Sequence, residues 1–394
     1  MSPGPAASAP LRGGSARPAP SHAAAQVIAT ASRRRYAWGR WLLVPLAAAL
    51  LVFVLGQFMS ARALDLDLSR ADWRWAAVAL AMQVLFFLLY GGLYRYAFRA
   101  VGVTSEALHL VPVLLASIFV KTVLPLTAAP AAAVFIDDAA ARGQSGARTA
   151  VGLVVVLIVD LVMALPFVAA GALALVLSAR LVAFALAGTA LFVAFIAVLL
   201  ILLALAGLRP AVLEALLGAC RAVVNHGARL IGRPSLLADD WAQHTADQLV
   251  AAVTSVPRHP RDIAVAAGHS LLLHVANLVG LGALFVTFGQ RLDPAALLAG
   301  FGISIVFFVV TIVPDGIGAV EGAMALVFVQ LGMTPTAAIL VTLAYRVLNV
   351  WLPVAIGFWC ARRLRLFGAD TSGWVRQRVI EPEPLDATVE PAEP

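Results

Sequence analysis

Residues 294–331 read PAALLAGFGISIVFFVVTIVPDGIGAVEGAMALVFVQL, an apolar stretch that proline, glycine and two acidic residues interrupt near its middle. Proline removes a helix hydrogen bond and glycine loosens the backbone. We therefore expect the stretch to enter a membrane, break at Pro314 and leave on the side from which it entered. Irregular backbone at membrane depth is tolerated only where it is buried in protein or lines a wet cavity.

An earlier stretch, 107–136, has the same design. Its FVKTVLP at 119–125 is echoed by FVVTIVP at 308–314, and small residues follow each proline. Three predicted full spans separate the two stretches, so the resulting hairpins would enter from opposite faces. Inverted-repeat transporters have this arrangement, with the binding site between broken helices near the midplane. The alternative is that these are two ordinary kinked helix pairs and the echo arose by chance.

The whole chain has the composition of a membrane protein. Of its 394 residues, 62% are hydrophobic and only 12% are charged, whereas soluble domains are about half apolar and about a quarter charged. A soluble enzyme, a disordered chain and a disulfide scaffold are therefore excluded. The net charge of +7 does not indicate nucleic acid as a partner, because the basic residues stand at the ends of apolar runs, where they set membrane topology.

Six segments are apolar enough to cross a bilayer, which takes about 20 residues. They are 41–59, 74–93, 149–177, 181–206, 263–288 and 336–360. The predicted fold class is all-α: a polytopic membrane helical bundle of about six full spans and two re-entrant broken-helix hairpins, which could form an inverted repeat.

The remaining segments are polar. Residues 1–40 contain no acidic residue and end in clustered arginines, which predicts a disordered basic tail. An organellar transit peptide, or cleavage at the signal-peptidase-like Ala61-Arg62-Ala63, are alternatives to an uncleaved first helix. The transmembrane domain is predicted to cover 41–367, with 207–262 forming amphipathic helices on the cytoplasmic surface. The Pro/Glu-rich 368–394 predicts a second disordered tail.

Arginine placement sets the expected orientation. The N-terminal tail, the Arg95/Arg99 loop, residues 207–262 and the cluster at 362–365 should all be cytoplasmic, which puts both termini inside.

The run PDGIGAVEG at 314–322 resembles the transmembrane region of lysylphosphatidylglycerol synthases, a region shared by a wider flippase-like family of membrane proteins. Its Pro-x-Gly-x-Gly-x-x-Glu spacing is followed by an apolar arm, a loop and a last span that carries Arg346. The early hairpin with Pro125, followed by a span with Asp160, resembles the N-terminal half of that family. The sequence departs from the pattern in this hairpin, where Lys121-Thr122 stands in place of an expected Asn before the proline.

The resemblance covers about residues 40–367. Lysylphosphatidylglycerol synthases also carry a soluble C-terminal aminoacyltransferase domain, and no segment of this sequence could be one. The resemblance therefore implies lipid translocation without lipid synthesis, with membrane lipids as partners. It also implies a multi-pass protein of the bacterial inner (plasma) membrane.

Ionisable residues at membrane depth cost about 2.5–3.5 kcal/mol each on insertion scales, so they are candidate functional residues. In a functional interpretation, Lys121 and Arg346 bind a lipid phosphate, which arginine can contact with two parallel hydrogen bonds. The backbone amides of Gly316 and Gly318 would add an anion site at a helix N-terminus. The alternative is that Lys121 or Arg346 only pairs with Asp160, Asp315 or Glu321 and so holds the hairpins together.

Two polar stripes follow from helical spacing. Thr342, Arg346, Asn349 and Pro353 share one face of the last span, and Ser270, His274 and Asn277 share one face of 263–288. Such stripes either satisfy each other across helices or line a common headgroup groove. A metal site at His269 and His274 is not expected, since their spacing is unsuitable and no carboxylate lies beside them in the sequence. The full set of candidate site residues is Lys121, Pro125, Asp160, Pro314, Asp315, Gly316, Gly318, Glu321, Arg346 and Asn349.

No catalytic motif is present: the sequence has no glycine-rich phosphate loop, no His-Glu-x-x-His and no nucleophile elbow. We therefore expect neither an enzyme nor a cofactor.

The predicted function is translocation of a phosphate-bearing lipid (phospholipid, aminoacylated lipid or polyprenyl/glycolipid) between leaflets. One alternative is a non-catalytic accessory or scaffold protein for envelope lipid or glycolipid synthesis, with lipid-synthesising or glycosyltransferase membrane proteins as partners. Another is an intramembrane lipid-modifying enzyme whose site is not recognised.

Overall fold

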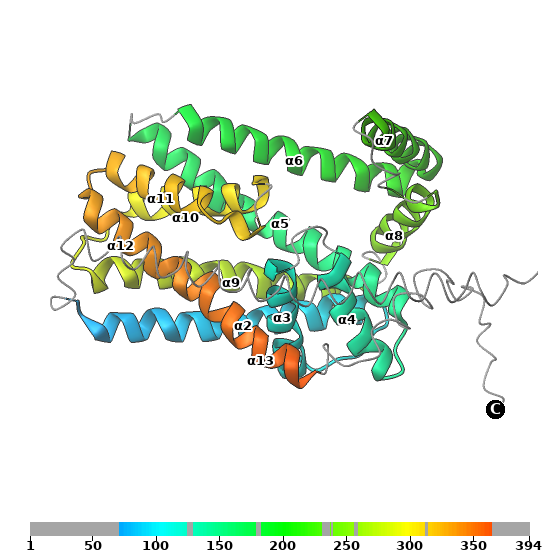
Figure 1. The fold of residues 1–394 in the computed structure, drawn as a ribbon, viewed down its shortest axis with the longest axis horizontal. Coiled ribbons are helices and arrows are strands. Elements are labelled where there is room, and N and C mark those ends of the chain that lie inside the picture. Colours follow the sequence, from blue (N-terminus) through cyan, green and yellow to red (C-terminus); the bar gives the residue numbers. More distant parts are fainter. Residues whose placement is uncertain are drawn as a thin grey trace, which may run out of the picture. The chain divides into compact units, whose positions relative to one another are not determined.

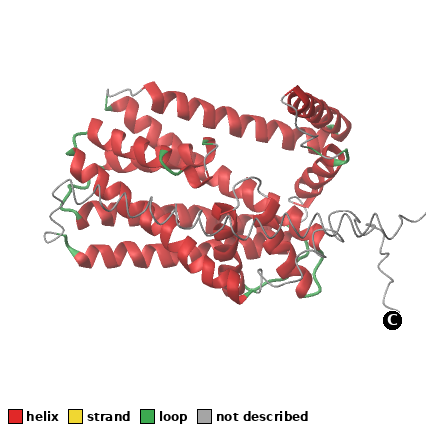
Figure 2. Cartoon of the chain, in the orientation of Figure 1, coloured by secondary structure: helices red, strands yellow, loops and turns green. Residues whose placement is uncertain are grey.

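The computed structural model describes residues 71–123, 129–178, 183–230, 237, 239–255, 259–311 and 314–364. Contacts divide the chain into one unit of residues 53–369 and another that joins 1–52 to 370–394, and every described residue belongs to the first. The regular elements in these ranges are all helices (Figure 2), as the predicted all-α fold class requires. The predicted span 41–59, both tails and Pro125 lie outside the described residues.

Five described helices are long and apolar enough to cross a membrane, and they match five of the six predicted spans. They are α2 (Trp73–Ala100), α5 (Gly146–Leu177), α6 (Ala183–Leu208), α9 (Pro260–Thr287), and the continuous run of α12 (Pro335–Arg346), η4 (Val347–Trp351) and α13 (Leu352–Arg363). The 28 residues of α2 and of α9 extend about 42 Å at 1.5 Å per residue, more than the hydrocarbon core of a bilayer.

The antiparallel pair α2 and α9 defines the two ends of this helical unit. At one end the Asp72 N–H donates to the carbonyl of Thr287 over 2.9 Å. At the other, Arg99 Nη2 lies 2.9 Å from Asp262 Oδ1 in the first turn of α9. We refer to these as the Thr287 end and the Arg99 end.

The first hairpin consists of α3 (Ala107–Val123) and α4 (Ala129–Ala141) and opens at the Arg99 end. Its base is tied there, because Arg142 Nη1 donates to the carbonyl of Thr104 and to Ser105 Oγ, each over 2.9 Å. The two helices have 17 and 13 residues, so each is too short to cross a bilayer of about 30 Å.

The second hairpin consists of α10 (Pro294–Val310), the 3₁₀ turn η3 (Pro314–Gly316) and α11 (Ala319–Gln330). It opens at the Thr287 end, because only a short loop separates the end of α9 from the start of α10. Asp293 caps α10 by accepting a hydrogen bond from the N–H of Ala295. Figure 1 shows α10 and α11 in one half of the helical unit and α3 and α4 in the other. The expected pair of hairpins that open at opposite ends is therefore observed, with α5, α6 and α9 between them in the sequence.

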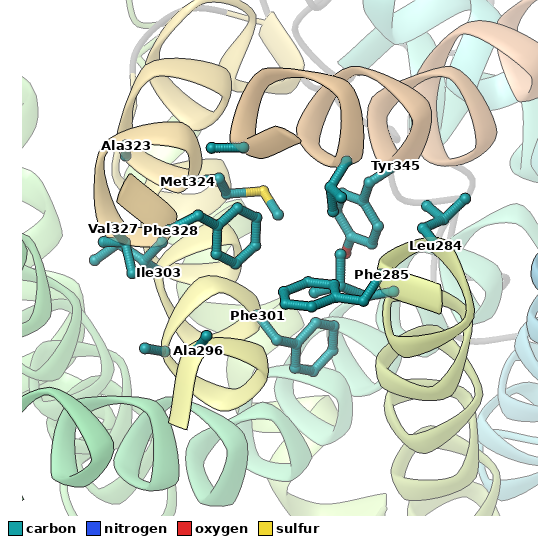
Figure 3. Close-up of a cluster of buried hydrophobic side chains, with 14 of the residues drawn as sticks. Leu284, Phe285, Ala296, Phe301, Ile303, Ala323, Met324, Val327, Phe328 and Tyr345 are labelled. Atoms are coloured by element: carbon teal, nitrogen blue, oxygen red, sulfur yellow. The ribbon is translucent and has the colours of Figure 1, made fainter. Parts of the chain in front are cut away.

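A buried apolar cluster holds the second hairpin against α9 and α12. Figure 3 shows Phe285, Phe301 and Phe328 at its centre, and the rings of Phe285 and Phe328 meet edge to face with centroids 5.1 Å apart. On its other side α10 approaches α5 at Gly171, where a Cβ would lie 2.6 Å from the carbonyl oxygen of Leu298. A side chain at Gly171 would therefore force the two helices apart.

The polar segment between α6 and α9 forms two helices, α7 (Pro210–Leu230) and α8 (Trp241–Ser255). The α7 helix is amphipathic, as expected: Leu213 and Leu217 are buried in a small cluster with α8, while Val212 and Leu216 on another side are about half exposed.

Candidate functional site

The ends of the two hairpins meet in one polar cluster, which we call the tip junction: Lys121 and Thr122 of α3, Asp315 of η3, Glu321 of α11 and Arg346 of α12. Lys121 Nζ lies 2.6 Å from Asp315 Oδ1, and Thr122 Oγ1 donates to Asp315 Oδ2. Thr122 and Asp315 are 193 residues apart in the sequence. One carboxylate therefore joins the hairpin from the Arg99 end to the hairpin from the Thr287 end.

Arg346 connects the second hairpin to the last span. Its Nε lies 2.7 Å from Glu321 Oε1, and its Nη2 donates to the backbone carbonyl of Asp315 over 2.7 Å. The residue is only 3% exposed. Two of its donors are thus used inside the protein, which is the pairing that the structural alternative for Arg346 predicts.

The backbone of the second tip is left-handed at three positions: φ is 52° at Asp315, 63° at Gly316 and 86° at Gly318. Asp tolerates this region better than most residues that carry a side chain, but it still needs stabilising contacts. These come from Lys121 and Thr122 on its carboxylate and from Arg346 on its carbonyl. The turn thus directs the carboxylate to α3 and the carbonyl to α12.

The backbone amide of Gly318 has a partner within the chain. The Gly318 N–H donates to Glu321 Oε2 over 2.7 Å, at the N-terminus of α11. An acidic group at this position also interacts favourably with the helix dipole. In this structure the anion at the predicted helix N-terminus site is therefore Glu321, which binds Gly318 and Arg346 together.

The four charges of the tip junction differ in exposure. The side chains of Asp315 and Arg346 are each 4% exposed and that of Glu321 is 17% exposed, whereas that of Lys121 is 39% exposed. The Lys121 ammonium also lies over the ring of Phe308, 4.8 Å from its centroid. Lys121 is therefore the cation of this cluster that an outside anion can reach.

Asp160 belongs to a different contact, between α5 and α9. Ser270 Oγ donates to Asp160 Oδ1 over 2.9 Å, and His274 Nε2 lies 3.3 Å from the same oxygen without hydrogen-bond geometry. The expectation that no carboxylate lies beside His274 is wrong. Asp160 of α5 is distant in the sequence but lies next to His274 in the folded protein. The described residues nevertheless contain no group of three or more His, Cys, Asp or Glu that could hold a metal ion.

The polar residues that share one face of the last span do not all reach the tip junction. Arg346 joins the tip junction, but Asn349 Nδ2 donates to the carbonyl of Tyr345 over 3.0 Å, within its own helix. Asn349 lies in the π-helical turn η4, and Pro353 has no N–H to donate to the carbonyl of Asn349. Asn349 is therefore not brought to the tip junction.

Several contacts of the tip junction were not predicted from the sequence. Thr122 and Phe308 complete the surroundings of Lys121 and Asp315, yet neither is ionisable and neither was a candidate. The one available signal is the hairpin echo, in which Thr122 corresponds to Thr311 and Phe308 to Phe119. Of the two predicted break points, Pro314 begins η3, and Pro125 lies outside the described residues.

The family model described as "Lysylphosphatidylglycerol synthase TM region" matches residues 41–357, a range that contains both hairpins and the whole tip junction. No curated protein and no solved structure matches the chain. The matched region and the five long apolar helices make it a multi-pass membrane protein. The chain belongs to the lysylphosphatidylglycerol synthase TM region family.

Proposed function

We propose that this protein moves a phosphate-bearing lipid between the two leaflets of a membrane. The observation that carries the proposal is the tip junction, where hairpins from opposite ends of the helical unit share the carboxylate of Asp315. If the two hairpin tips separated, a polar path would connect the Arg99 end of the helical unit with the Thr287 end. A headgroup could then pass the hairpins while its apolar chains stayed in the lipid.

Lys121 is the proposed headgroup contact. It pairs with Asp315 in this structure, and its partial exposure leaves the ammonium within reach of a second anion. A lipid phosphate that replaced Asp315 would give Lys121 a new ion pair, and the Asp315 carboxylate, buried in the closed tip junction, would be hydrated as the tips separate. Binding would thereby favour the open state, because a ligand shifts a conformational equilibrium only by its differential affinity for the two states.

Arg346 has a bracing role in this proposal, because its bonds to Glu321 and to the Asp315 carbonyl keep the second tip on α12. Unequal headgroup contacts on the two sides would produce alternating access, and equal contacts would produce scrambling. Neither process requires a catalytic step. The substrate is a phospholipid, an aminoacylated lipid or a polyprenyl or glycolipid phosphate.

The proposed location is the bacterial inner membrane, with the Arg99 end and both termini in the cytoplasm. The described arginines gather at the Arg99 end and are fewer at the Thr287 end, which is the pattern of the positive-inside rule. Among the described residues, Arg95, Arg99, Arg142, Arg148 and Arg261 lie at the Arg99 end, and Arg74 and Arg291 lie at the Thr287 end.

A leaflet-exchange assay tests the proposal directly. The purified protein in liposomes should exchange at least one lipid of a panel containing labelled anionic phospholipids and polyprenyl phosphates. Lys121→Gln should lower exchange at least tenfold, and Arg261→Gln, an exposed arginine at the Arg99 end outside the tip junction, should leave it unchanged. Absence of exchange for every lipid would contradict the proposal and favour the accessory-protein alternative. Formation of a new lipid product would favour an enzyme instead.

A further inference from the structure

A cavity of about 530 Å³ lies at the Arg99 end, remote from the tip junction. It is formed by the end of α2, the loop that follows it, the start of α3 and the loop after α4. Its ionisable lining consists of Arg95, Arg99, Glu106, His109 and Arg142. Three arginines thus face one carboxylate in a space of the size that ligand sites commonly have. We refer to it as the basic pocket.

The arginines of the basic pocket differ in what they already bind. Arg142 already uses four of its five N–H donors, because Nε and Nη2 each donate to Asp138 and Nη1 donates to both Thr104 and Ser105 of the α2–α3 loop. Arg99 gives one of its donors to Asp262. Arg95 has neither a carboxylate nor a hydrogen bond among the described residues, although its Nε is buried. Its guanidinium lies over the ring of Tyr96, 5.7 Å from the centroid.

The depth of the basic pocket matches that of lipid headgroups. From Trp73, an aromatic residue at the Thr287 end, α2 takes 22 residue steps to Arg95, which is about 33 Å and close to the thickness of a bilayer hydrocarbon core. Beside the pocket, Leu108 of α3 is 72% exposed. A ligand in the pocket would therefore have its charged part among arginines and an apolar part beside the exposed side chain of Leu108.

We infer that the basic pocket binds the phosphate of an anionic lipid headgroup from the leaflet at the Arg99 end. Arg95 is its principal ligand and Arg99 the second, because each has donors left. Arg142 and His109 shape the wall through their shared partner Asp138. This inference rests on the proposed function for the role of the pocket, which is to load lipid before its headgroup reaches Lys121.

Equilibrium binding tests the inference without any transport. Full-length protein in dodecyl maltoside would be titrated with water-soluble dihexanoyl phosphatidylglycerol, and in a separate arm with inorganic phosphate. Arg95→Gln should weaken lipid binding about tenfold, the effect expected for a lost charge-assisted hydrogen bond. Arg261→Gln removes an exposed arginine from the same end outside the pocket and should bind like the unaltered protein. Glu106→Gln removes the opposing carboxylate and should bind more tightly, a gain that misfolding cannot produce.

The outcomes separate this inference from the proposed function. Equal lipid affinity of Arg95→Gln and unaltered protein, or no gain for Glu106→Gln, would overturn the pocket assignment even if the liposomes exchange lipid. Inorganic phosphate that binds as tightly as the lipid would show that the pocket takes free phosphate, which also overturns it. Lipid binding that depends on Arg95, in a protein that exchanges no lipid, would uphold the pocket and reject translocation.

Discussion

At the residue scale, the tip junction depends on one carboxylate and one guanidinium that each serve two elements. Asp315 binds α3 with its side chain and α12 with its carbonyl. Arg346 binds that carbonyl and Glu321, and both of these partners belong to the second hairpin. Burying a carboxylate or a guanidinium costs free energy. The cost is tolerated here because each group is paired with opposite charge or with hydrogen-bond partners. A loss at either residue therefore affects the position of a whole hairpin.

Arg346→Lys separates the two roles considered for this arginine. A lysine can replace only one of the two bonds, so we expect a loss of about 2 kcal/mol in stability, the value of one buried charge-assisted bond. Thermal unfolding in detergent measures it. Asn349→Ala is the matched control, because Asn349 bonds only its own helix, and it should change stability by much less. Unchanged stability together with lost lipid exchange would instead identify Arg346 as a phosphate ligand.

At the scale of elements, the second hairpin is held by close backbone contact on one side and by aromatic packing on the other. The α10 helix meets α5 at Gly171 and Gly302, where only hydrogen atoms separate the two backbones. On the opposite side of the hairpin, Phe301 of α10 and Phe328 of α11 pack in the same buried cluster as Phe285 of α9. The short helices of this hairpin therefore stay in place without crossing the bilayer themselves.

Gly171→Ala tests the importance of this contact. The added Cβ would lie 2.6 Å from the Leu298 carbonyl, so α5 and α10 must separate, and overpacking of this kind costs about 1–3 kcal/mol. A lower melting temperature is expected. Gly322→Ala is the control, because nothing lies within 4 Å of the added Cβ there, and alanine has the higher helix propensity. If both substitutions lower the melting temperature equally, the close contact is not what limits stability.

At the scale of the whole molecule, the two hairpins open at opposite ends of the helical unit. The proposed orientation of that unit in the membrane rests on charge, because the described arginines gather at the Arg99 end. The native Cys220 is exposed on α7, and Gln290 follows α9 at the Thr287 end. These two positions therefore report on opposite sides.

Cysteine labelling in intact cells checks the orientation. Cys220 should react with a membrane-impermeant maleimide only after permeabilisation, whereas Gln290→Cys in a Cys220→Ala background should react at once. The Cys220→Ala protein alone accounts for reaction at Cys360. Labelling of Cys220 from outside would reverse the assignment of the cytoplasmic face, and with it the leaflet from which the basic pocket draws lipid.

Five of the spans and the break at Pro314 could be predicted from the sequence, because they depend on local properties of the chain. About 20 apolar residues suffice to predict a crossing, and the proline and glycines at 314–318 predict a break wherever the segment packs. The candidate cations and carboxylates followed from the same reasoning, since charge at membrane depth is rare.

The partners of those charges were decided only by the tertiary structure. Lys121 could have paired with Asp160, Asp315 or Glu321 as far as the sequence shows, and the packing of α3 against η3 selects Asp315. Asp160 lies instead beside His274, because α5 and α9 are neighbours. The basic pocket likewise exists only where two loops and α3 converge. Hydropathy and backbone propensity act over a few residues, whereas these contacts join segments that are distant in the chain and meet only in the folded bundle.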